Sequence, residues 1–186
     1  GRLAPLFYAS RNQINFLMPA GLATADNVSV QVVGVGGVVA TGTIQVVAAA
    51  PAIFSEDASG RGAGAILNGV TFARGPFGVT TPQNPGDDKR TRLSIFLTGI
   101  RNLPNPDTTN DIRLADGSTL ANLAESLTVT IGGTAVAVEF AGRHSVFLGL
   151  DQINVVLPAE LAGRGTLDLV VRAASQSSNT VQVTIQ

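Results

Sequence analysis

A single histidine limits the catalytic chemistry open to this chain of 186 residues. His144 lies between Arg143 and Ser145, just before an expected strand. A serine nucleophile needs a base within hydrogen-bonding reach, but the side chains of adjacent residues in an extended chain point apart. The sequence also lacks a Gly-x-Ser-x-Gly turn. We therefore expect no catalytic residue and interpret His144 as a loop or rim residue.

Acidic residues are the second group that could do chemistry. A glycosidase holds two carboxylates at a fixed separation in a cleft, whereas the acidic pairs here lie in turn-rich segments and are interpreted as solvated surface. The only lysine, Lys89, lies in a charged loop and not in a hydrophobic strand, so an autocatalytic crosslink to Asn or Asp is not expected. The acidic pairs are Glu56-Asp57, Asp87-Asp88 and Asp107 with Asp111.

The long irregular segment 101–122 is a candidate binding loop, because loops of this length are usually functional or disordered. Its oxygen-bearing side chains are of the type that calcium prefers, although their spacing matches no 12-residue EF-hand loop. Calcium and glycan binding stay open for this loop. Beyond these alternatives no metal or cofactor is predicted, and one histidine is too few for a histidine-based metal site. The candidate binding residues are Arg101, Asn105, Asp107, Asn110 and Asp111.

The composition excludes several classes of protein. Hydrophobic residues make up 45% and charged residues 13%, with a net charge of −1. Disorder is therefore not expected, and no basic stripe predicts nucleic-acid binding. The chain has no cysteine, which excludes disulfides and thiolate sites. No apolar run approaches the roughly 20 residues of a membrane helix, so no membrane insertion is expected. A low-charge surface rich in Thr, Ser, Asn and Gly is typical of secreted or cell-surface proteins.

Strands, and not helices, are expected to position these residues, because apolar residues alternate with period two between frequent glycines and prolines. Val28, Val30 and Val32 alternate with polar residues, which predicts a strand with one buried face. The Gly132-Gly133 pair predicts a hairpin turn. A short helix is expected around 120–126. The expected strands are 3–9, 13–17, 27–33, 41–47, 65–73, 93–98, 127–131, 134–140, 152–157, 166–172 and 179–185.

One strand motif occurs twice, and we define it by its shared Gln-Ile-Asn core followed by a Pro-Ala pair. The first copy covers 13–23 and the second 152–162. Flanking elements recur in the same order, so one supersecondary unit is used twice. The amides project from one face of the strand and the apolar residues from the other. We interpret the amides as partners of backbone groups at a sheet corner, with ligand recognition as the alternative. The motif residues are Gln13, Asn15, Pro19, Gln152, Asn154 and Pro158.

The two copies differ in the strands that precede them. Residues 93–186 have leading strands and are predicted to form a complete immunoglobulin-like β-sandwich. Residues 1–50 lack those strands and are predicted to form a partial unit, with 51–92 as linker and variable region. The predicted fold class is all-β, with two immunoglobulin-like β-sandwich units, the first incomplete. Because a half-sandwich leaves an unpaired edge, we expect the missing strands to come from another copy or from an upstream segment.

Several further stretches occur in a specific order: 4–10, 12–16, 50–54, 97–102, 129–133, 149–154, 161–165 and 178–181. This order resembles the uncharacterised C-terminal domain described in Solibacter and common in large secreted acidobacterial proteins. Members of that family look like immunoglobulin-type, IPT/TIG-like sandwiches. The resemblance implies a secreted or envelope-associated location and brings no catalytic residues. The chain departs from the pattern by extra residues between Asn102 and Leu127 and by a short 65–85 region.

The expected function is a non-enzymatic extracellular structural module that self-assembles into a surface or filamentous structure by β-strand or edge complementation. Its expected partners are copies of itself or an upstream segment of the same protein. The alternative is a carbohydrate- or surface-binding accessory domain of a larger secreted protein, with 101–122 as the binding loop. Aromatic residues make up only 5% of the chain and tryptophan is absent, which is a poor composition for stacking on sugars.

Overall fold

The structure, a computed structural model, describes residues 1–19, 21–23 and 27–186. The chain divides into two compact units, Gly1–Ala48 and Ala49–Gln186, and each is described here by itself. Ala20, which belongs to the first copy of the repeated motif, lies outside the described residues.

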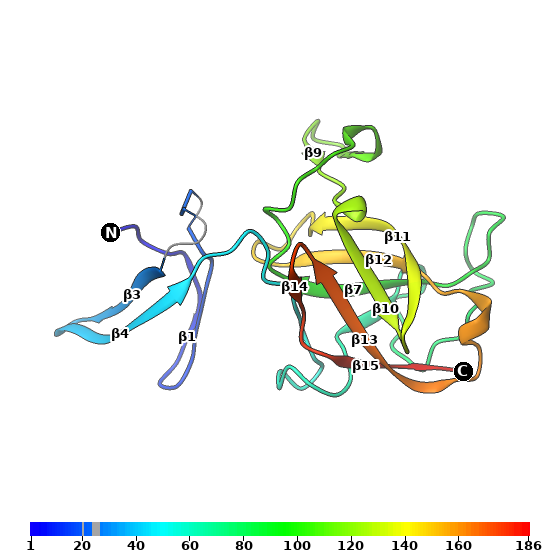
Figure 1. Cartoon of the computed structure of the whole chain (residues 1–186), viewed down its shortest axis with the longest axis horizontal. Coiled ribbons are helices and arrows are strands. Elements are labelled where there is room, and N and C mark those ends of the chain that lie inside the picture. The colour runs from blue at the N-terminus through cyan, green and yellow to red at the C-terminus, as the bar shows by residue number, and fades with distance from the viewer. Residues whose placement is uncertain (20, 24–26) are drawn as a thin grey trace. The chain divides into compact units, whose positions relative to one another are not determined.

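The first unit consists of two antiparallel hairpins (Figure 1). Strands β1 (Leu6–Ala9) and β2 (Ile14–Phe16) form one, and β3 (Asn27–Gly34) and β4 (Gly37–Gln45) form the other. The expected alternation is present in β3, where Val28, Val30 and Val32 are half-buried and the residues between them are exposed. No described side chain of this unit is buried, because no second layer covers that face.

The second unit is a curled, sandwich-like sheet of nine strands. Its main path runs β14-β13-β10-β11-β12-β7-β5, with β15 beside β13 and β6 beside β7. A further small hairpin and three single-turn 3-10 helices complete the unit. The strands are β5 (Ala52–Ile53), β6 (Ile66–Asn68), β7 (Arg92–Thr98), β8 (Ile112–Arg113), β9 (Thr119–Leu120), β10 (Leu127–Ile131), β11 (Thr134–Arg143), β12 (Asp151–Val156), β13 (Gly165–Ala173), β14 (Gln176–Ser177) and β15 (Val181–Ile185). The 3-10 helices are η1 (Thr108–Asn110), η2 (Ala124–Ser126) and η3 (Ala159–Leu161).

Strand β11 passes from one half of the curled sheet to the other. Its first residues pair with β10, and the stretch from Ala137 to Arg143 pairs with β12. The outer edge of β15 is bridged by backbone bonds from Gly64 to Gln182 and from Phe77 to Thr184, each 2.9 Å long. The sheet therefore wraps around one core, and part of its outer edge at β15 is also hydrogen-bonded.

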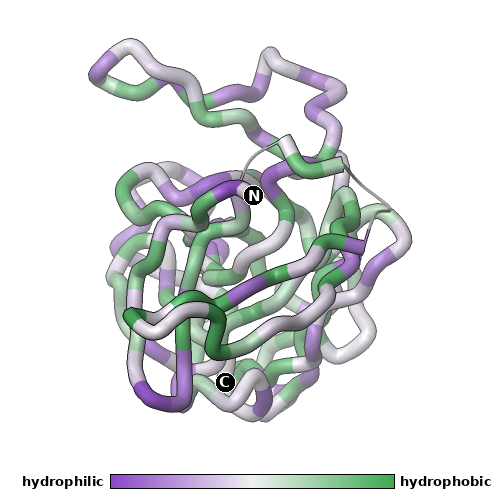
Figure 2. The backbone as a smooth tube through the Cα atoms, turned by 90° about the vertical axis from the view of Figure 1, so that its left-hand side faces the viewer, coloured by the Kyte–Doolittle hydropathy of each residue, from purple (hydrophilic) through white to green (hydrophobic). Residues whose placement is uncertain are grey.

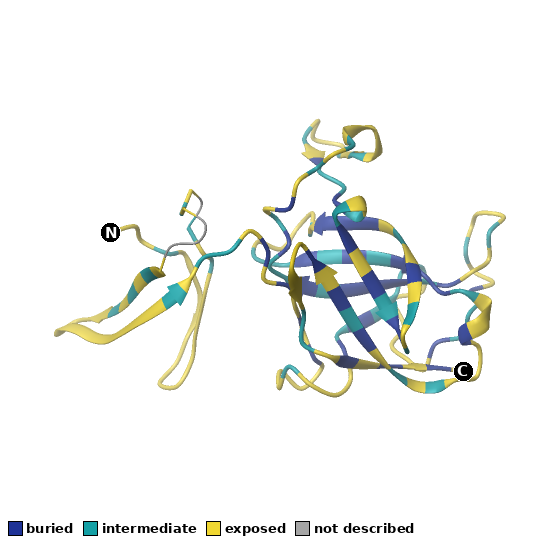
Figure 3. Cartoon of the chain, in the orientation of Figure 1, coloured by how far each residue is buried: buried dark blue, intermediate teal, exposed yellow. Residues whose placement is uncertain are grey.

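Alternating residues of these strands fill the core of the second unit. Leu93, Ile95 and Leu97 of β7 are fully buried, and the same pattern occurs in β10, β12, β13 and β15. Hydrophobic residues recur along the whole chain (Figure 2). Burial does not follow this distribution, because buried residues lie in the second unit and the first is exposed or half-buried (Figure 3). The hydrophobic effect thus stabilises the two units very unequally.

Residues 51–92 are part of the second unit, and the prediction that they form a linker is wrong. Strands β5 and β6 both pair with β7, and Ile53, Ile66 and Phe77 enter the core. The Asn179 amide fixes β5 further, since its oxygen accepts from Ile53 N at 2.7 Å and its nitrogen donates to Ile53 O at 2.9 Å. The segment has no clear period because its paired stretches are very short and each contacts residues distant in the sequence.

At two places the fold needs backbone conformations or close contacts that only glycine allows without strain. Gly132 and Gly133 turn the predicted hairpin between β10 and β11 with φ of 56° and 80°, which an ordinary residue adopts only with strain. At Gly99, φ is 89°, and a Cβ atom would lie 1.9 Å from the Ala50 carbonyl oxygen. The expected helix around 120–126 is only a 3-10 turn over Ala124–Ser126.

Candidate functional site

The repeated motif has the same internal hydrogen bond in both copies. In β2 the Gln13 side chain donates from Nε2 to Asn15 Oδ1 at 2.8 Å. In β12 the Gln152 side chain donates to Asn154 Oδ1 at 2.7 Å. Residues two apart on a strand point to the same face, which brings each pair of amides together. The amides therefore bind each other in both units, in place of the backbone groups expected from the sequence.

The strand before each motif repeats as well, including an irregularity in register. In the first unit Leu6 pairs with Phe16 and Tyr8 with Asn15, so that Phe7 is an extra residue. In the second unit Val138 pairs with Val155 and Phe140 with Asn154, so that Glu139 is the extra residue. The bulge thus occupies the same place relative to the motif. Tyr8 is the structural counterpart of Phe140, since each pairs with the asparagine of its motif.

The strands after each motif also correspond. In the first unit Gln45 of β4 faces Asn27 of β3. In the second unit Gln182 of β15 faces Asp168 of β13. Both pairs are antiparallel and follow the motif in the same order, so the four strands of the first unit correspond in order to the end of β11, to β12, to β13 and to β15.

The two copies differ in what lies on their other edges. In the second unit β12 also pairs with β7, and β13 also pairs with β10. Within the described parts of the chain, β2 pairs only with β1, and β3 pairs only with β4. The open edges of the first unit are thus the positions that β7 and β10 occupy in the second. We call the outer edge of β2, residues 14–16, the open motif edge.

Side chains at the open motif edge are exposed where their counterparts are buried. Ile14 is 36% and Phe16 40% exposed, whereas Ile153 and Val155 are fully buried. Leu6, Phe7 and Tyr8 on the neighbouring strand are also exposed. Monomeric proteins rarely keep such large apolar side chains together on a surface, and contiguous apolar patches mark interaction sites. This edge is the candidate functional site.

A polar contact marks the difference between the edges. In the second unit Ser94 of β7 donates from Oγ to Asn154 Oδ1 at 3.1 Å, so that this oxygen accepts two hydrogen bonds. The first unit has the matching bond from Gln13 but no counterpart of Ser94 among its described residues. Ser94 was not among the residues predicted from the sequence. Its place opposite the motif in the antiparallel pair is the signal that identifies it.

The prolines of the motif lie beyond the strands. Pro158 precedes η3 and has extended backbone, and β12 ends before it at Val156. Pro19 follows the end of β2 at Phe16 and is half-buried. Both positions agree with the interpretation that proline ends the pairing of this strand.

The residues of the candidate binding loop bond mainly to one another. Asp107 accepts from Thr109 N at 2.8 Å, and these contacts with the Thr109 hydroxyl and N–H hold the pKa of Asp107 below its usual range. Asn110 donates to Asp107 at 2.8 Å, and Asn105 donates to Asp111 at 3.0 Å. Asn105 Oδ1 is buried without a hydrogen-bond partner. In the part of the chain that the structure describes, no cluster of three or more His, Cys, Asp or Glu residues has metal-binding geometry.

Arg101 lies apart from this loop cluster and pairs with Asp151, the residue before the second motif. Its Nε donates to Asp151 Oδ1, and its Nη2 donates to the Leu150 carbonyl at 2.7 Å. Asp151 is fully buried and also accepts from Ile100 N at 3.2 Å. Burial raises the pKa of Asp151, and the Arg101 hydrogen bond opposes this rise. We assign this pair a structural role.

His144 forms local contacts in its loop. Its Nδ1 accepts from Val146 N at 3.1 Å and from Phe147 N at 3.2 Å, and its ring lies 5.0 Å from that of Phe147. Lys89 is exposed, and its amine donates to the Asn84 backbone carbonyl. Neither residue forms the arrangement that nucleophilic catalysis needs.

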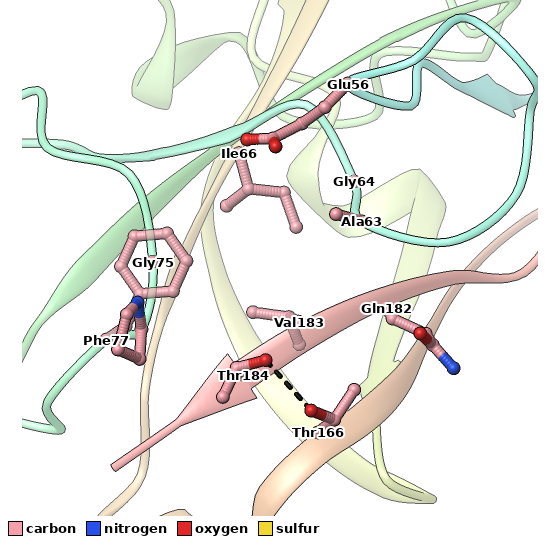
Figure 4. A pocket seen from close by; sticks show the side chains of 11 residues that line it. Glu56, Ala63, Gly64, Ile66, Gly75, Phe77, Thr166, Gln182, Val183 and Thr184 are labelled. Atoms are coloured by element: carbon pink, nitrogen blue, oxygen red, sulfur yellow. Dashed lines mark hydrogen bonds between the residues drawn. The ribbon is translucent and has the colours of Figure 1, made fainter.

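A shallow pocket of about 330 Å³ lies between β15 and the segment around Gly64 and Phe77 (Figure 4). Its polar groups are few. Thr166 and Thr184 share a hydrogen bond of 3.0 Å, and Glu56 pairs with Arg74 at 3.4 Å. Among the described contacts, no hydrogen bond joins Glu56 to either hydroxyl, so the pocket shows no paired nucleophile and base.

Comparison with known protein families, with curated proteins and with solved structures finds no match. The resemblance drawn from the sequence motifs thus stays a prediction. Within the described residues, no helix is long and apolar enough to cross a membrane.

Proposed function

We propose that this chain is a non-enzymatic structural module that assembles with neighbouring copies through β-strand complementation of its first unit, outside the cell or at its surface. The observation that carries the proposal is the open motif edge. The same strand is flanked on both sides in the second unit and, among the described residues, on one side in the first. An open strand edge with exposed apolar side chains is a template for pairing with another chain.

The arrangement of such contacts decides the assembly. An isologous contact closes a dimer, whereas a head-to-tail contact extends into a filament. The low share of charged residues, 13%, supports association, since it leaves little electrostatic repulsion between copies. The extracellular location rests on the low-charge, hydroxyl-rich composition.

Light scattering over a range of protein concentrations tests the proposal. We expect the mass of the unmodified chain to rise above that of the 19.0 kDa monomer as its concentration increases. The variant Ile14→Pro blocks the edge directly. Backbone groups of Gln13 and Leu17 bond to the β1 side, so those of Ile14 face outward and proline removes an outward N–H. Association should weaken in this variant while its β1–β2 hairpin persists.

A control variant separates the two units. Phe147 lies in an exposed apolar loop, 146–148, of the second unit. If the open motif edge drives association, Phe147→Ser leaves the mass unchanged and Ile14→Pro lowers it. If the unmodified chain is a monomer at every concentration, the proposed assembly is wrong. If Phe147→Ser lowers the mass and Ile14→Pro does not, the contact between copies lies in the second unit.

A further inference from the structure

The second unit indicates what kind of strand completes the first. We propose that the open motif edge accepts an antiparallel strand with the side-chain pattern of β7: an apolar residue, a hydroxyl residue and an apolar residue opposite Phe16, Asn15 and Ile14. This inference rests on the proposed function, because it names the partner of the same edge.

The register follows from the pairing in the second unit. There β7 runs antiparallel to β12, with Leu93 opposite Val155, Ser94 opposite Asn154 and Ile95 opposite Ile153. The matching pairs and bulge on the other side show that β2 is the counterpart of β12. A one-residue slip would turn every side chain of the added strand to the wrong face. The pattern of the accepted strand is therefore specific.

The hydroxyl is the polar part of this specificity. Asn15 Oδ1 accepts from Gln13 Nε2, and a carboxamide oxygen has two lone pairs. In the second unit the same two acceptor positions are filled by Gln152 and Ser94. Once a strand covers the edge, water no longer reaches Asn15 freely. A partner with Ser or Thr at this position satisfies the oxygen, and one with Ala or Val does not.

The strand that fits this edge is an extended segment that is not already paired within a folded sheet. The β7 strand of a second copy is not available, because Leu93, Ile95 and Leu97 are fully buried and β7 is paired along both edges. Releasing it would expose these core side chains to water. A free extended segment of the same pattern has no such competing contacts. Pairing of β2 with β2 of a second copy is the rival outcome of the test.

A synthetic peptide with the sequence of residues 91–99, with two lysines added at each end for solubility, tests the assignment on the full chain. The chain has one tyrosine, Tyr8, and no tryptophan. Tyr8 lies in β1 beside Asn15, and the peptide has no tyrosine, so tyrosine emission reports on the first unit alone. We expect saturable binding that changes Tyr8 emission and lowers the self-association seen by light scattering.

Two matched changes test the register. Replacing the peptide serine that corresponds to Ser94 by alanine should weaken binding about 3- to 10-fold, the size of one hydrogen bond. In the protein variant Asn15→Ala the two peptides should bind equally, because the hydroxyl then has no acceptor. A scrambled peptide should not bind. Equal binding of all peptides to the unmodified chain, or binding without a change in Tyr8 emission, would overturn the assignment.

The remaining outcomes separate this inference from the proposed function. If the chain self-associates but the peptide does not bind, the strand assignment is wrong and complementation by copies stands. If the chain is monomeric but the peptide binds, the proposed self-assembly is wrong and the strand assignment is supported. The chain has no cysteine, so Asn15→Cys gives a unique thiol. A disulfide dimer of this variant under mild oxidation, unaffected by the peptide, would identify β2 of a second copy as the occupant and overturn the inference.

Discussion

The Gln-Ile-Asn strand is enclosed between two neighbours in the second unit, whereas the described part of the first unit gives it one neighbour. Its amide–amide bond is 2.8 Å long in the first unit and 2.7 Å in the second, and the bulge of the preceding strand lies at the same place. Local interactions therefore produce the same hairpin without help from the rest of the fold. Burial differs, since Ile14 is exposed where Ile153 is buried.

The comparison shows that the two hairpins share a backbone conformation but differ in how much burial stabilises them. Hydrogen bonds and alternating side chains specify a strand pair, but a two-stranded hairpin is at best marginally stable in water. Most of the free energy of folding comes from apolar surface removed from water. In the second unit that burial needs β7 and β10, and the first unit has no described counterpart of either.

Truncating the equivalent isoleucines tests this comparison most strongly. Ile153→Ala should lower the free energy of unfolding of the second unit by about 2–5 kcal/mol, because it leaves a cavity in a closed core. Ile14→Ala should change the first unit by less than about 1 kcal/mol, since Ile14 already contacts water. Urea unfolding followed by circular dichroism reports mainly on the second unit, and Tyr8 fluorescence reports on the first. Equal losses would show that Ile14 is buried in solution.

The equivalent asparagines give the next largest contrast. Asn154→Ala leaves Gln152 and Ser94 without their shared acceptor in a half-buried site, which should cost about 1–3 kcal/mol. Asn15→Ala should have almost no effect on the chain alone, because water replaces the bond from Gln13. The same urea titrations measure both variants. A large loss for Asn15→Ala would mean that this amide already has a partner strand.

Asp151 precedes the second motif where Asn12 precedes the first, and its pH dependence sharpens the comparison. Because burial raises the pKa of Asp151 in the folded state, its stabilising contribution is complete below the unfolded value of about 3.9 and is lost as the pH rises through the folded pKa. The unfolding free energy of the unmodified chain relative to Asp151→Asn should therefore fall as the pH rises above the unfolded pKa of about 3.9. A difference that is constant with pH would contradict the raised pKa.

The smallest expected effect concerns Asp88, whose contribution to stability has the opposite pH dependence from that of Asp151. Hydrogen bonds from Arg90 and Arg92 hold the pKa of Asp88 well below its usual range. Its contribution is present above the unfolded pKa and is lost as the pH falls through the folded pKa. Asp88 is solvent-accessible, so Asp88→Asn should lower the melting temperature only slightly at pH 7, and less at pH 2. Differential scanning calorimetry at the two pH values measures this. A larger effect at pH 2 would reverse the assignment.

The sequence predicted the strands whose side chains alternate over five or more residues. The segment 127–131 matches β10, and the Gly132-Gly133 turn joins it to β11 as expected. The prediction of a linker failed for 51–92, although β6 lies within the expected strand 65–73; β5 and β6 are only two and three residues long. Such short strands show no period of their own. They are strands only because β7 offers an edge to them.

The candidate site was partly predictable for a similar reason. The repeat in the sequence located Gln13, Asn15, Gln152 and Asn154, since local similarity is visible without coordinates. The contact between Ser94 and Asn154 joins residues 60 apart, and neither segment alone contains a pattern that predicts it. The five loop residues 101–111 were grouped by type. The structure brings Asn105, Asp107, Asn110 and Asp111 into local pairs and places Arg101 on Asp151.

The amino-acid sequence by itself determined that the chain is all-β and that one strand–turn–strand unit is used twice, because period-two alternation and turn residues act over a few neighbouring positions. Only the tertiary structure decided which copy is enclosed. Enclosure depends on strands that are distant in the sequence. Their apolar faces stabilise the fold only when two halves of the sheet pack together and exclude water. Around β12 the neighbouring strands meet that requirement, whereas no strand in the described part of the chain does so around the open edge of β2.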